Sequence, residues 1–220
     1  MRQNSHATIQ IGVKEYLVDL KKIPYFDAFL GFQQRAGQPP VHEDVPFFDI
    51  INSSVEQGYR QIFRLMPTQL SDYRILCETF EYLAIDVLKN RKLCDIVKDT
   101  KLGRDEWDPD EKRTIKGLKS VPRDAAFQLL YLFMLGEFEL DAKDSNIAYN
   151  AVQYIVSHRR IFRCRTRKII REVFENRFDI SEKQRSGLNK WPISEPGSDE
   201  WQVEDATTEE DDYDSDYSDW

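Results

Sequence analysis

The residue types on which catalytic and metal sites depend are scarce in this sequence. Glycine occurs only nine times among 220 residues. The patterns GxGxxG, GxxxxGK(S/T), GxSxG and HExxH do not occur, so the sequence offers no phosphate-binding loop, no serine-nucleophile turn and no zinc-binding helix of these kinds. With 39 Asp and Glu residues, paired acids carry no information about catalysis. We therefore predict that the protein is not an enzyme and that it needs no cofactor.

Cysteine and histidine are also few, and neither residue type is grouped. No CxxC pair occurs among the three cysteines, and the three histidines are equally scattered: Cys77, Cys94 and Cys164; His6, His42 and His158. An odd number of widely spaced cysteines fits a reducing compartment rather than a disulfide framework. These residues do not have the spacing of zinc ligands, so we expect no metal site.

Long hydrophobic runs are missing as well. The longest, from Ala125 to Leu135, is interrupted only by Gln128 and is about half as long as a bilayer-spanning helix requires. We expect it to form a buried helix. Residues 1–6 lack the apolar core of a signal peptide and are expected to be disordered. The sequence thus predicts an intracellular protein, in the nucleus or cytoplasm, without a membrane partner.

Basic residues are absent from the end of the sequence. Residues 199–220 hold eleven Asp or Glu and no Lys or Arg. Because the whole chain has a formal net charge of −8 and this segment contributes −11, residues 1–198 carry +3. A segment this acidic cannot bury enough apolar surface to offset the entropy lost on ordering. We predict that residues 195–220 form a disordered acidic tail.

The stretch from Pro46 to Leu88 contains the clearest structural patterns. Residues 46–51 form a short apolar run, which predicts a strand. Apolar residues then recur at spacings of three and four and predict a helix that Pro67 ends. This stripe consists of Val55, Tyr59, Ile62, Phe63 and Met66. A second stripe predicts another helix with Ser71 as its N-cap. It contains Leu76, Phe80, Leu83 and Val87.

These residues resemble the second half of a BTB/POZ domain, and the preceding residues resemble its first half. The matching segments are Phe48–Leu65 and Tyr73–Leu88, the opening hairpin Thr8–Gly12 and Glu15–Asp19, and the first helix Ile23–Phe29. The resemblance covers residues 7–88. It implies a small sheet with packed helices and a role in protein–protein interaction. Between the first helix and residue 41, the Gly and paired Pro of residues 33–40 predict an exposed loop.

The resemblance also implies candidate contact residues. BTB proteins that recruit a cullin carry a hydrophobic-x-Glu triplet near this loop, and here Val41 and Glu43 match it. Tyr25 and Phe26 match the aromatic pair of the family's first helix and complete the candidate partner contacts. The alternative is that the triplet is an ordinary polar approach to a strand. Since only six residues precede the first strand, we do not expect the swapped dimer of many animal BTB domains, and other self-association is left open.

The remaining sequence predicts helices. Residues 91–119 are predicted to be a charged connecting segment with a short helix near Leu93–Val97. An all-helical module is predicted for residues 120–194. Its first expected helix runs from Ser120 to Leu135 and is ended by Gly136. A second runs from N-caps at residues 144–146 to Val156, and a third from His158 to Glu175. A short turn capped by Ser181 follows.

One basic cluster is dense enough to suggest a function. Residues 158–171 hold seven cations and no acid. On a continuous helix, five of them fall within an arc of about 120°. These are Arg159, Arg160, Arg163, Arg167 and Arg171. Such a face can bind nucleic acid or an acidic partner, can be an ordinary solvated helix face, or can be masked by the acidic tail.

Together, these patterns predict an α+β protein with a BTB-like domain at residues 7–90, the connecting segment, the helical module and the tail at 195–220. The leading functional hypothesis is a protein-interaction module or adaptor. Its candidate roles are a substrate adaptor for a cullin-type ubiquitin ligase and a transcription-associated scaffold. The alternative hypothesis is a nucleic-acid or chromatin-associated factor that binds through residues 158–171.

Overall fold

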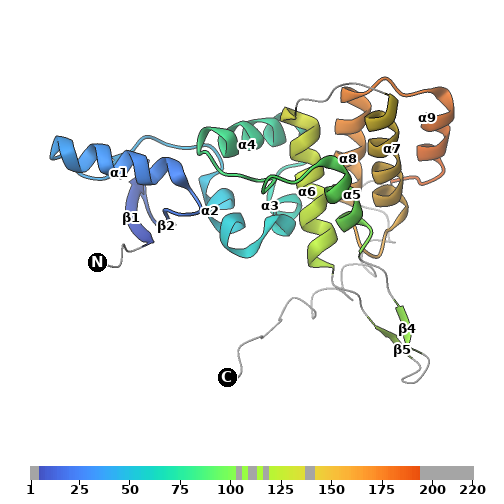
Figure 1. The fold of residues 1–220 in the computed structure, drawn as a ribbon, viewed down its shortest axis with the longest axis horizontal. Helices are drawn as coiled ribbons and strands as arrows, with labels where there is room; N and C mark the ends of the chain where they lie inside the picture. Colours follow the sequence, from blue (N-terminus) through green and yellow to red (C-terminus); the bar gives the residue numbers. More distant parts are fainter. Residues whose placement is uncertain (1–4, 103–105, 109–112, 116–118, 137–141, 194–220) are drawn as a thin grey trace.

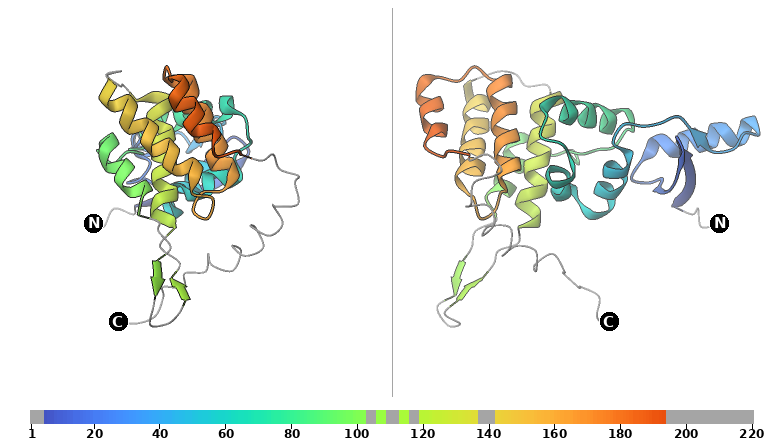
Figure 2. Two further views of the ribbon diagram at one scale, coloured as in Figure 1. Left: turned by 90° about the vertical axis from the view of Figure 1, so that its right-hand side faces the viewer. Right: turned by 180° about the vertical axis from the view of Figure 1, so that it is seen from behind.

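The computed structural model describes residues 5–102, 106–108, 113–115, 119–136 and 142–193 of the chain. Figures 1 and 2 show an elongated arrangement: the small sheet and α1 (Pro24–Ala36) lie at one end, α2 (Phe48–Gln57), α3 (Ile62–Leu65) and α4 (Leu70–Tyr82) occupy the middle, and a helical bundle forms the other end. The protein is therefore α+β, as the sequence predicts.

The sheet contains three strands in the order β2-β1-β3. Strands β1 (His6–Ile11) and β2 (Lys14–Asp19) pair in antiparallel fashion, which confirms the predicted hairpin. After helix α1 (Pro24–Ala36), the two-residue strand β3 (Val41–His42) pairs in parallel with β1. Alternation along β1 turns Ile9 and Ile11 into the core, while Thr8 and Gln10 face solvent.

Helix α1 is longer than the sequence predicts. Residues 33–36, expected in a loop, are helical. The helix ends where Gly37 adopts a left-handed conformation with φ 66°, and its N–H donates to the carbonyls of Gln33 and Gln34. The loop therefore begins at Gly37, not Gln33.

The strand predicted for residues 46–51 is wrong. These residues begin helix α2 (Phe48–Gln57) after a left-handed residue, Phe47, with φ 58°. Burial explains the difference, because Phe48, Ile51 and Ser54 face the core at helical spacing. Asp49 in the first turn is exposed and accepts hydrogen bonds from Lys14 Nζ and Tyr16 Oη, each 2.8 Å long.

The single helix predicted from Val55 to Met66 is interrupted. Gly58, with φ 92°, ends α2, and a 3-10 turn η1 (Tyr59–Gln61) leads into the short helix α3 (Ile62–Leu65). The next helix, α4 (Leu70–Tyr82), has Gln69 rather than Ser71 as its N-cap. It also ends earlier than predicted, and Leu83 and Val87 remain buried in the loop that follows.

The bundle is built around α6 (Ser120–Leu135), which matches its predicted bounds. It packs against α5 (Leu93–Thr100), α8 (Cys164–Arg177), α4 and η1. Helices α7 (Ala142–Ser157) and α9 (Glu182–Asn189) complete the bundle. Two short strands that the sequence did not predict, β4 (Glu106–Asp108) and β5 (Arg113–Ile115), form an antiparallel pair.

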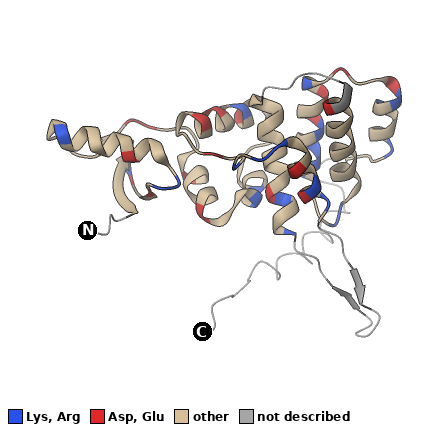
Figure 3. Ribbon diagram, viewed as in Figure 1, with Lys and Arg blue, Asp and Glu red and all other residues tan. Residues whose placement is uncertain are grey.

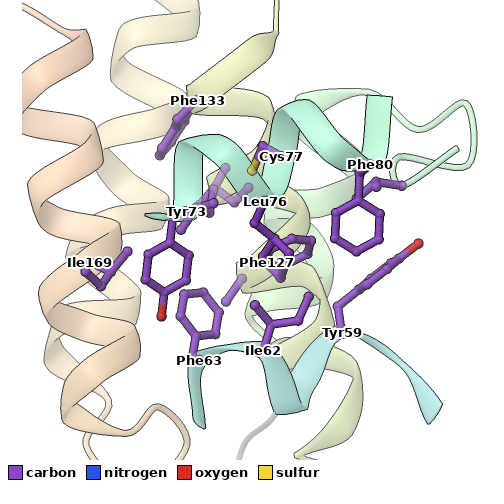
Figure 4. Close-up of a cluster of buried hydrophobic side chains, with 14 of the residues drawn as sticks. Tyr59, Ile62, Phe63, Tyr73, Leu76, Cys77, Phe80, Phe127, Phe133 and Ile169 are labelled. Carbon is purple, nitrogen blue, oxygen red and sulfur yellow. The ribbon is translucent and has the colours of Figure 1, made fainter. Parts of the chain in front are cut away.

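One hydrophobic core runs through both halves. Phe127 of α6 lies among aromatic rings of the N-terminal half, with centroid distances of 5.3 Å to Tyr59, 5.6 Å to Phe80 and 6.2 Å to Phe63 (Figure 4). Further along α6, Phe133 lies 6.0 Å from Phe174 of α8. Helix α6 therefore joins the sheet-bearing half to the rest of the bundle by burying large aromatic side chains on both sides.

The continuous helix predicted from His158 to Glu175 is also wrong. Helix α7 ends at Ser157, and α8 starts at Cys164 after a turn. In this turn Ile161 and Phe162 are 4% and 0% exposed. The N–H groups of Ile161 and Phe162 both donate to the carbonyl of His158, which closes the turn and holds these two side chains in the core.

Candidate protein-interaction site

A groove of about 380 Å³ lies between α4 and the loop that joins β3 to α2. We call it the α4 groove. Its lining comes from two segments of the sequence, residues 42–46 and residues 75–82. They supply His42, Glu43, Asp44, Val45 and Pro46 on one side, and Ile75, Glu78, Thr79 and Tyr82 on the other.

The α4 groove combines exposed apolar surface with acidic side chains. Ile75 and Tyr82 are 41% and 53% exposed, and both lie in the lining of this one groove. Glu43, Asp44 and Glu78 are exposed around them. Glu78 also accepts a 2.9 Å hydrogen bond from Arg74 Nε, one turn earlier on α4. The surface is thus suited to a partner with both apolar and basic groups.

A hydrogen-bond chain supports this groove from below. Tyr82 Oη donates to Tyr25 Oη at 2.6 Å, and Tyr25 Oη lies 2.8 Å from His42 Nε2. His42 Nδ1 lies 2.8 Å from the carbonyl oxygen of Glu43, which can only accept. In the neutral imidazole, Nδ1 therefore donates and Nε2 accepts from Tyr25. The chain fixes α1, β3 and α4 relative to one another.

Burial of Tyr25 strengthens this arrangement. Burial, together with the hydrogen bond from Tyr82, raises the pKa of Tyr25 to about 12. The hydroxyl therefore stays protonated and available as a donor at neutral pH. The rings of Tyr25 and Phe29 also lie 5.5 Å and 5.1 Å from the imidazole of His42, both in edge-to-face geometry.

The candidate partner contacts occupy different environments. Glu43 lines the α4 groove, and Tyr25 lies beneath it in the hydrogen-bond chain. Val41 is 45% exposed and pairs in register with Gln10 of β1, away from the groove lining. The structure places Phe26 in the core, fully buried, 5.5 Å from Phe48, so this side chain supports the surface rather than forming it.

The five arginines of the predicted arc do not share one helix face. Arg159 and Arg160 are exposed on the turn, and Arg163 is the N-cap of α8. Arg167 is only 4% exposed, because it occupies the buried side of α8. Arg171 donates to Glu175 at 2.8 Å and to Asn189 at 2.6 Å. The predicted arc is therefore corrected: the break at residues 158–163 separates its members.

A different set of cations gathers where α6 and α8 begin. Arg123 in the first turn of α6 donates to the carbonyl of Ile161 at 2.9 Å, so this turn of α6 lies against the α7–α8 turn. Arg165 donates to the carbonyl of Arg64 on α3 at 3.2 Å. Figure 3 shows basic segments at this end of the bundle. We define the basic end as Arg64, Lys119, Arg123, Arg159, Arg160, Arg163 and Arg165.

A polar junction between the two halves was not predicted from the sequence. Asp124 of α6 accepts a 2.6 Å hydrogen bond from the N–H of Arg60, close to the start of η1. Gly58 makes room for this carboxylate, because a Cβ there would lie 2.8 Å from Asp124 Oδ2. Burial raises the pKa of Asp124, although the Arg60 N–H opposes the shift.

Gln128, one turn further along α6, continues the junction. Its Nε2 donates to the carbonyl of Val87 at 2.8 Å, and its Oε1 accepts from Arg91 at 3.1 Å. Arg91 also donates to Asp99 at 2.6 Å. The only sequence signal for this network is the presence of Asp and Gln within an otherwise apolar stretch. A cavity of about 590 Å³ lies beside this network, and its lining contains both acidic and basic residues. Two of them, Arg91 and Asp99, form the ion pair described above.

Other site types find no support in the described part of the chain. Within these residues, no group of three or more His, Cys, Asp or Glu side chains is arranged to hold a metal ion. No helix there combines the length and apolar character needed to cross a bilayer. Comparison with protein-family models, with curated proteins and with solved structures finds no match.

Proposed function

We propose that this chain is a protein-interaction module that binds a partner protein through the α4 groove. The observation that carries the proposal is the exposure of Ile75 and Tyr82 within a concave surface surrounded by acidic side chains. Large apolar side chains at this exposure are typical of binding surfaces when they are grouped in a groove. The hydrogen-bonded support from Tyr25 and His42 keeps the groove in one shape before binding, which lowers the entropy cost of docking.

The order of the elements supports a BTB-like assignment for the N-terminal half. A hairpin, a helix and then further packed helices agree with what the resemblance implies, whereas the strand expected at residues 46–51 is replaced by the start of α2. The proposal adopts this assignment for residues 7–90. In this view the chain is an adaptor that holds a partner at the α4 groove, while the helical bundle provides other surfaces.

The chemistry of the groove defines the kind of partner. Ile75 and the ring of Tyr82 would bury aliphatic or aromatic side chains. Glu43 and Asp44 would pair with Lys or Arg on the partner, since Glu78 is already paired with Arg74. A cullin is one candidate partner, because Glu43 belongs to the hydrophobic-x-Glu triplet. Isothermal titration with the N-terminal domain of a purified cullin tests it directly, and absence of binding at about 100 µM removes the cullin from the proposal.

Site-specific crosslinking tests the groove itself. A photoreactive amino acid at position 78 should crosslink to a protein partner in the native cell, because this position lies on the groove. The matched control carries the same amino acid at position 17, where Leu17 is 60% exposed on the sheet. Adducts at position 78 that are absent at position 17 support the proposal. The same adducts at both positions would count against a specific groove.

The basic end favours a second candidate function, binding of nucleic acid. It brings cations from α3, α6 and α8 together at one end of the bundle. Contacts to phosphate groups give an affinity that falls steeply with salt. Replacing Arg159, Arg160 and Arg163 with Gln should then abolish binding to a DNA or RNA duplex. If the variant binds as tightly as the wild-type chain, this candidate is excluded.

A further inference from the structure

We propose that the basic end is the docking surface for the acidic segment 199–220 of the same chain. This inference is independent of the α4 groove, which lies on the other half of the molecule. Its first support is charge: the segment holds eleven acids without Lys or Arg, while residues 158–171 hold seven cations and no acid. The fold then adds Arg64, Lys119 and Arg123 to the exposed cations of this stretch.

The basic end has cations that the fold leaves open to a ligand. Arg159 and Arg160 are exposed, and Arg163 is partly exposed. Within the described ranges, no side-chain hydrogen bond or ion pair engages the guanidinium groups of these three residues. This differs from Arg171, which is held by Glu175 and Asn189. Three like charges within five residues of one turn repel one another, and an acidic segment relieves this repulsion.

Helix direction adds to the positive potential. Arg123 in the first turn of α6 reaches the turn that immediately precedes α8, so both helices begin at the basic end. Their opposite ends also coincide, since Arg177 in the last turn of α8 donates to the carbonyl of Gly136, the C-cap of α6. Two parallel helices thus direct the positive ends of their dipoles toward this surface, where they outnumber the single negative end of α7, and Lys119 and Arg163 lie at the two N-caps.

The length of the chain allows the segment to reach this surface. The hydrogen bond from Arg171 to Asn189 places the end of α9 beside the middle of α8. Arg171 lies seven residues after Cys164, which is about 10 Å along the helix axis. The described chain ends at Ile193, and the six steps from there to Asp199 span at most about 20 Å. The whole segment extends up to about 90 Å from Ile193, so its acids can meet the basic end without unfolding any described element.

Tethering makes such docking effective even when each contact is weak. A segment joined by a short linker has an effective concentration of about millimolar order at a surface within its reach. Docking with an intrinsic dissociation constant of about 0.1 mM would occupy the basic end most of the time and weaken a competing polyanion about tenfold. The segment would thereby restrict the basic end to polyanions of higher charge density than its own, because only these displace it.

Paramagnetic relaxation enhancement on the full chain tests the inference. A spin label is attached at Ser215→Cys in a Cys94→Ser background, because Cys94 is exposed whereas Cys77 and Cys164 are buried. At about 20 mM salt, the label should broaden the amide signals of residues 159–165. At about 0.5 M salt, where the Debye length is only about 4 Å, the broadening should disappear.

Two matched triple variants separate specific docking from general attraction. The first replaces Arg159, Arg160 and Arg163 with Gln. The second replaces three exposed cations of α9 and its C-cap, close to where the described chain ends: Lys183, Arg185 and Lys190. Broadening at residues 159–165 should be lost in the first variant and kept in the second. Equal broadening in both variants, or no broadening at low salt in the wild-type chain, overturns the inference.

A competition experiment distinguishes the segment from an external polyanion. Converting all eleven acids to Asn or Gln should raise the affinity for heparin about tenfold at low salt. The gain should vanish when Arg159, Arg160 and Arg163 are also replaced. If heparin or DNA binds the wild-type and neutralised chains equally, the basic end is an open polyanion surface and the segment does not occupy it.

Discussion

The contact between Gly58 and Asp124 gives a sharp prediction about how the two halves are joined. Gly58 has φ 92° and ψ 164°, a region of backbone conformation open almost only to glycine, so an Ala there costs about 1–3 kcal/mol in strain. The new Cβ would also lie 2.8 Å and 3.1 Å from the carboxylate oxygens of Asp124. Displacing that carboxylate breaks its bond to the N–H of Arg60, a charged hydrogen bond worth about 1.5–3 kcal/mol. We expect Gly58→Ala to lower the free energy of unfolding by about 3–5 kcal/mol.

Two other glycines provide matched controls for this measurement. Gly37 also has a positive φ, of 66°, but nothing lies within 4 Å of a Cβ there, so Gly37→Ala reports strain without a clash. Gly31 lies inside α1 with open space around it, and Gly31→Ala should stabilise the protein by up to about 1 kcal/mol. Urea unfolding followed by circular dichroism measures all three variants. If Gly58→Ala costs no more than Gly37→Ala, the Asp124 contact does not join the two halves as described.

Three further predictions concern ionisation, packing and the support of the groove. Because burial raises the pKa of Asp124 above its ordinary value, the folded state takes up its proton at a higher pH than the unfolded state. Wild-type stability relative to Asp124→Asn should therefore rise as pH falls from neutral toward 3.8, and a parallel pH dependence of the two chains in urea titrations would contradict this. Leu83→Ala, at a fully buried position, should cost about 2–5 kcal/mol, whereas coincident urea midpoints would remove Leu83 from the core. Tyr25→Phe removes both hydrogen bonds of the central hydroxyl and should lower the free energy of unfolding by about 1–3 kcal/mol. This loss should exceed that of Tyr82→Phe, which removes only the hydrogen bond at the exposed end of the hydrogen-bond chain. The opposite order would show that the Tyr25–His42 bond contributes little.

Much of the fold follows from local patterns in the sequence. The near-continuous apolar run of residues 125–135 predicts the surrounded helix α6. Ser181 was predicted to cap a short helix, and it does so in a capping box with Gln184. These elements were predictable because neighbouring residues alone determine them.

The errors arise where distant residues decide the local conformation. The run from Phe47 to Ile51 is apolar enough for either a strand or a helix, and only the packing of Phe48 and Ile51 against the core selects the helix. The break after Ser157 was missed because Phe162 is buried in the turn just as it would be on an uninterrupted helix, so periodicity could not distinguish the two. As a result, Arg167 was assigned to an exposed arc although it lies on the buried side of α8.

The α4 groove could be predicted only in part. Glu43 was identified through the resemblance, but the periodicity of this stretch does not distinguish Ile75 or Tyr82 as members of a binding surface. Their role depends on the turn of the chain after β3, which brings residues 42–46 against α4. The basic end likewise combines α3, α6 and α8, and periodicity within one segment cannot predict contacts among three.

The central claim is that the α4 groove binds a protein partner. Affinity purification with quantitative mass spectrometry, from the cell in which the chain is expressed, tests it most directly. The comparison uses the wild-type chain, Ile75→Asp in the groove and Leu17→Asp on the exposed face of the sheet, both at exposed positions where folding should persist. We predict that at least one protein is recovered with the wild-type chain and with Leu17→Asp but is lost with Ile75→Asp. Recovery of the same proteins in the same amounts with all three chains would contradict the account.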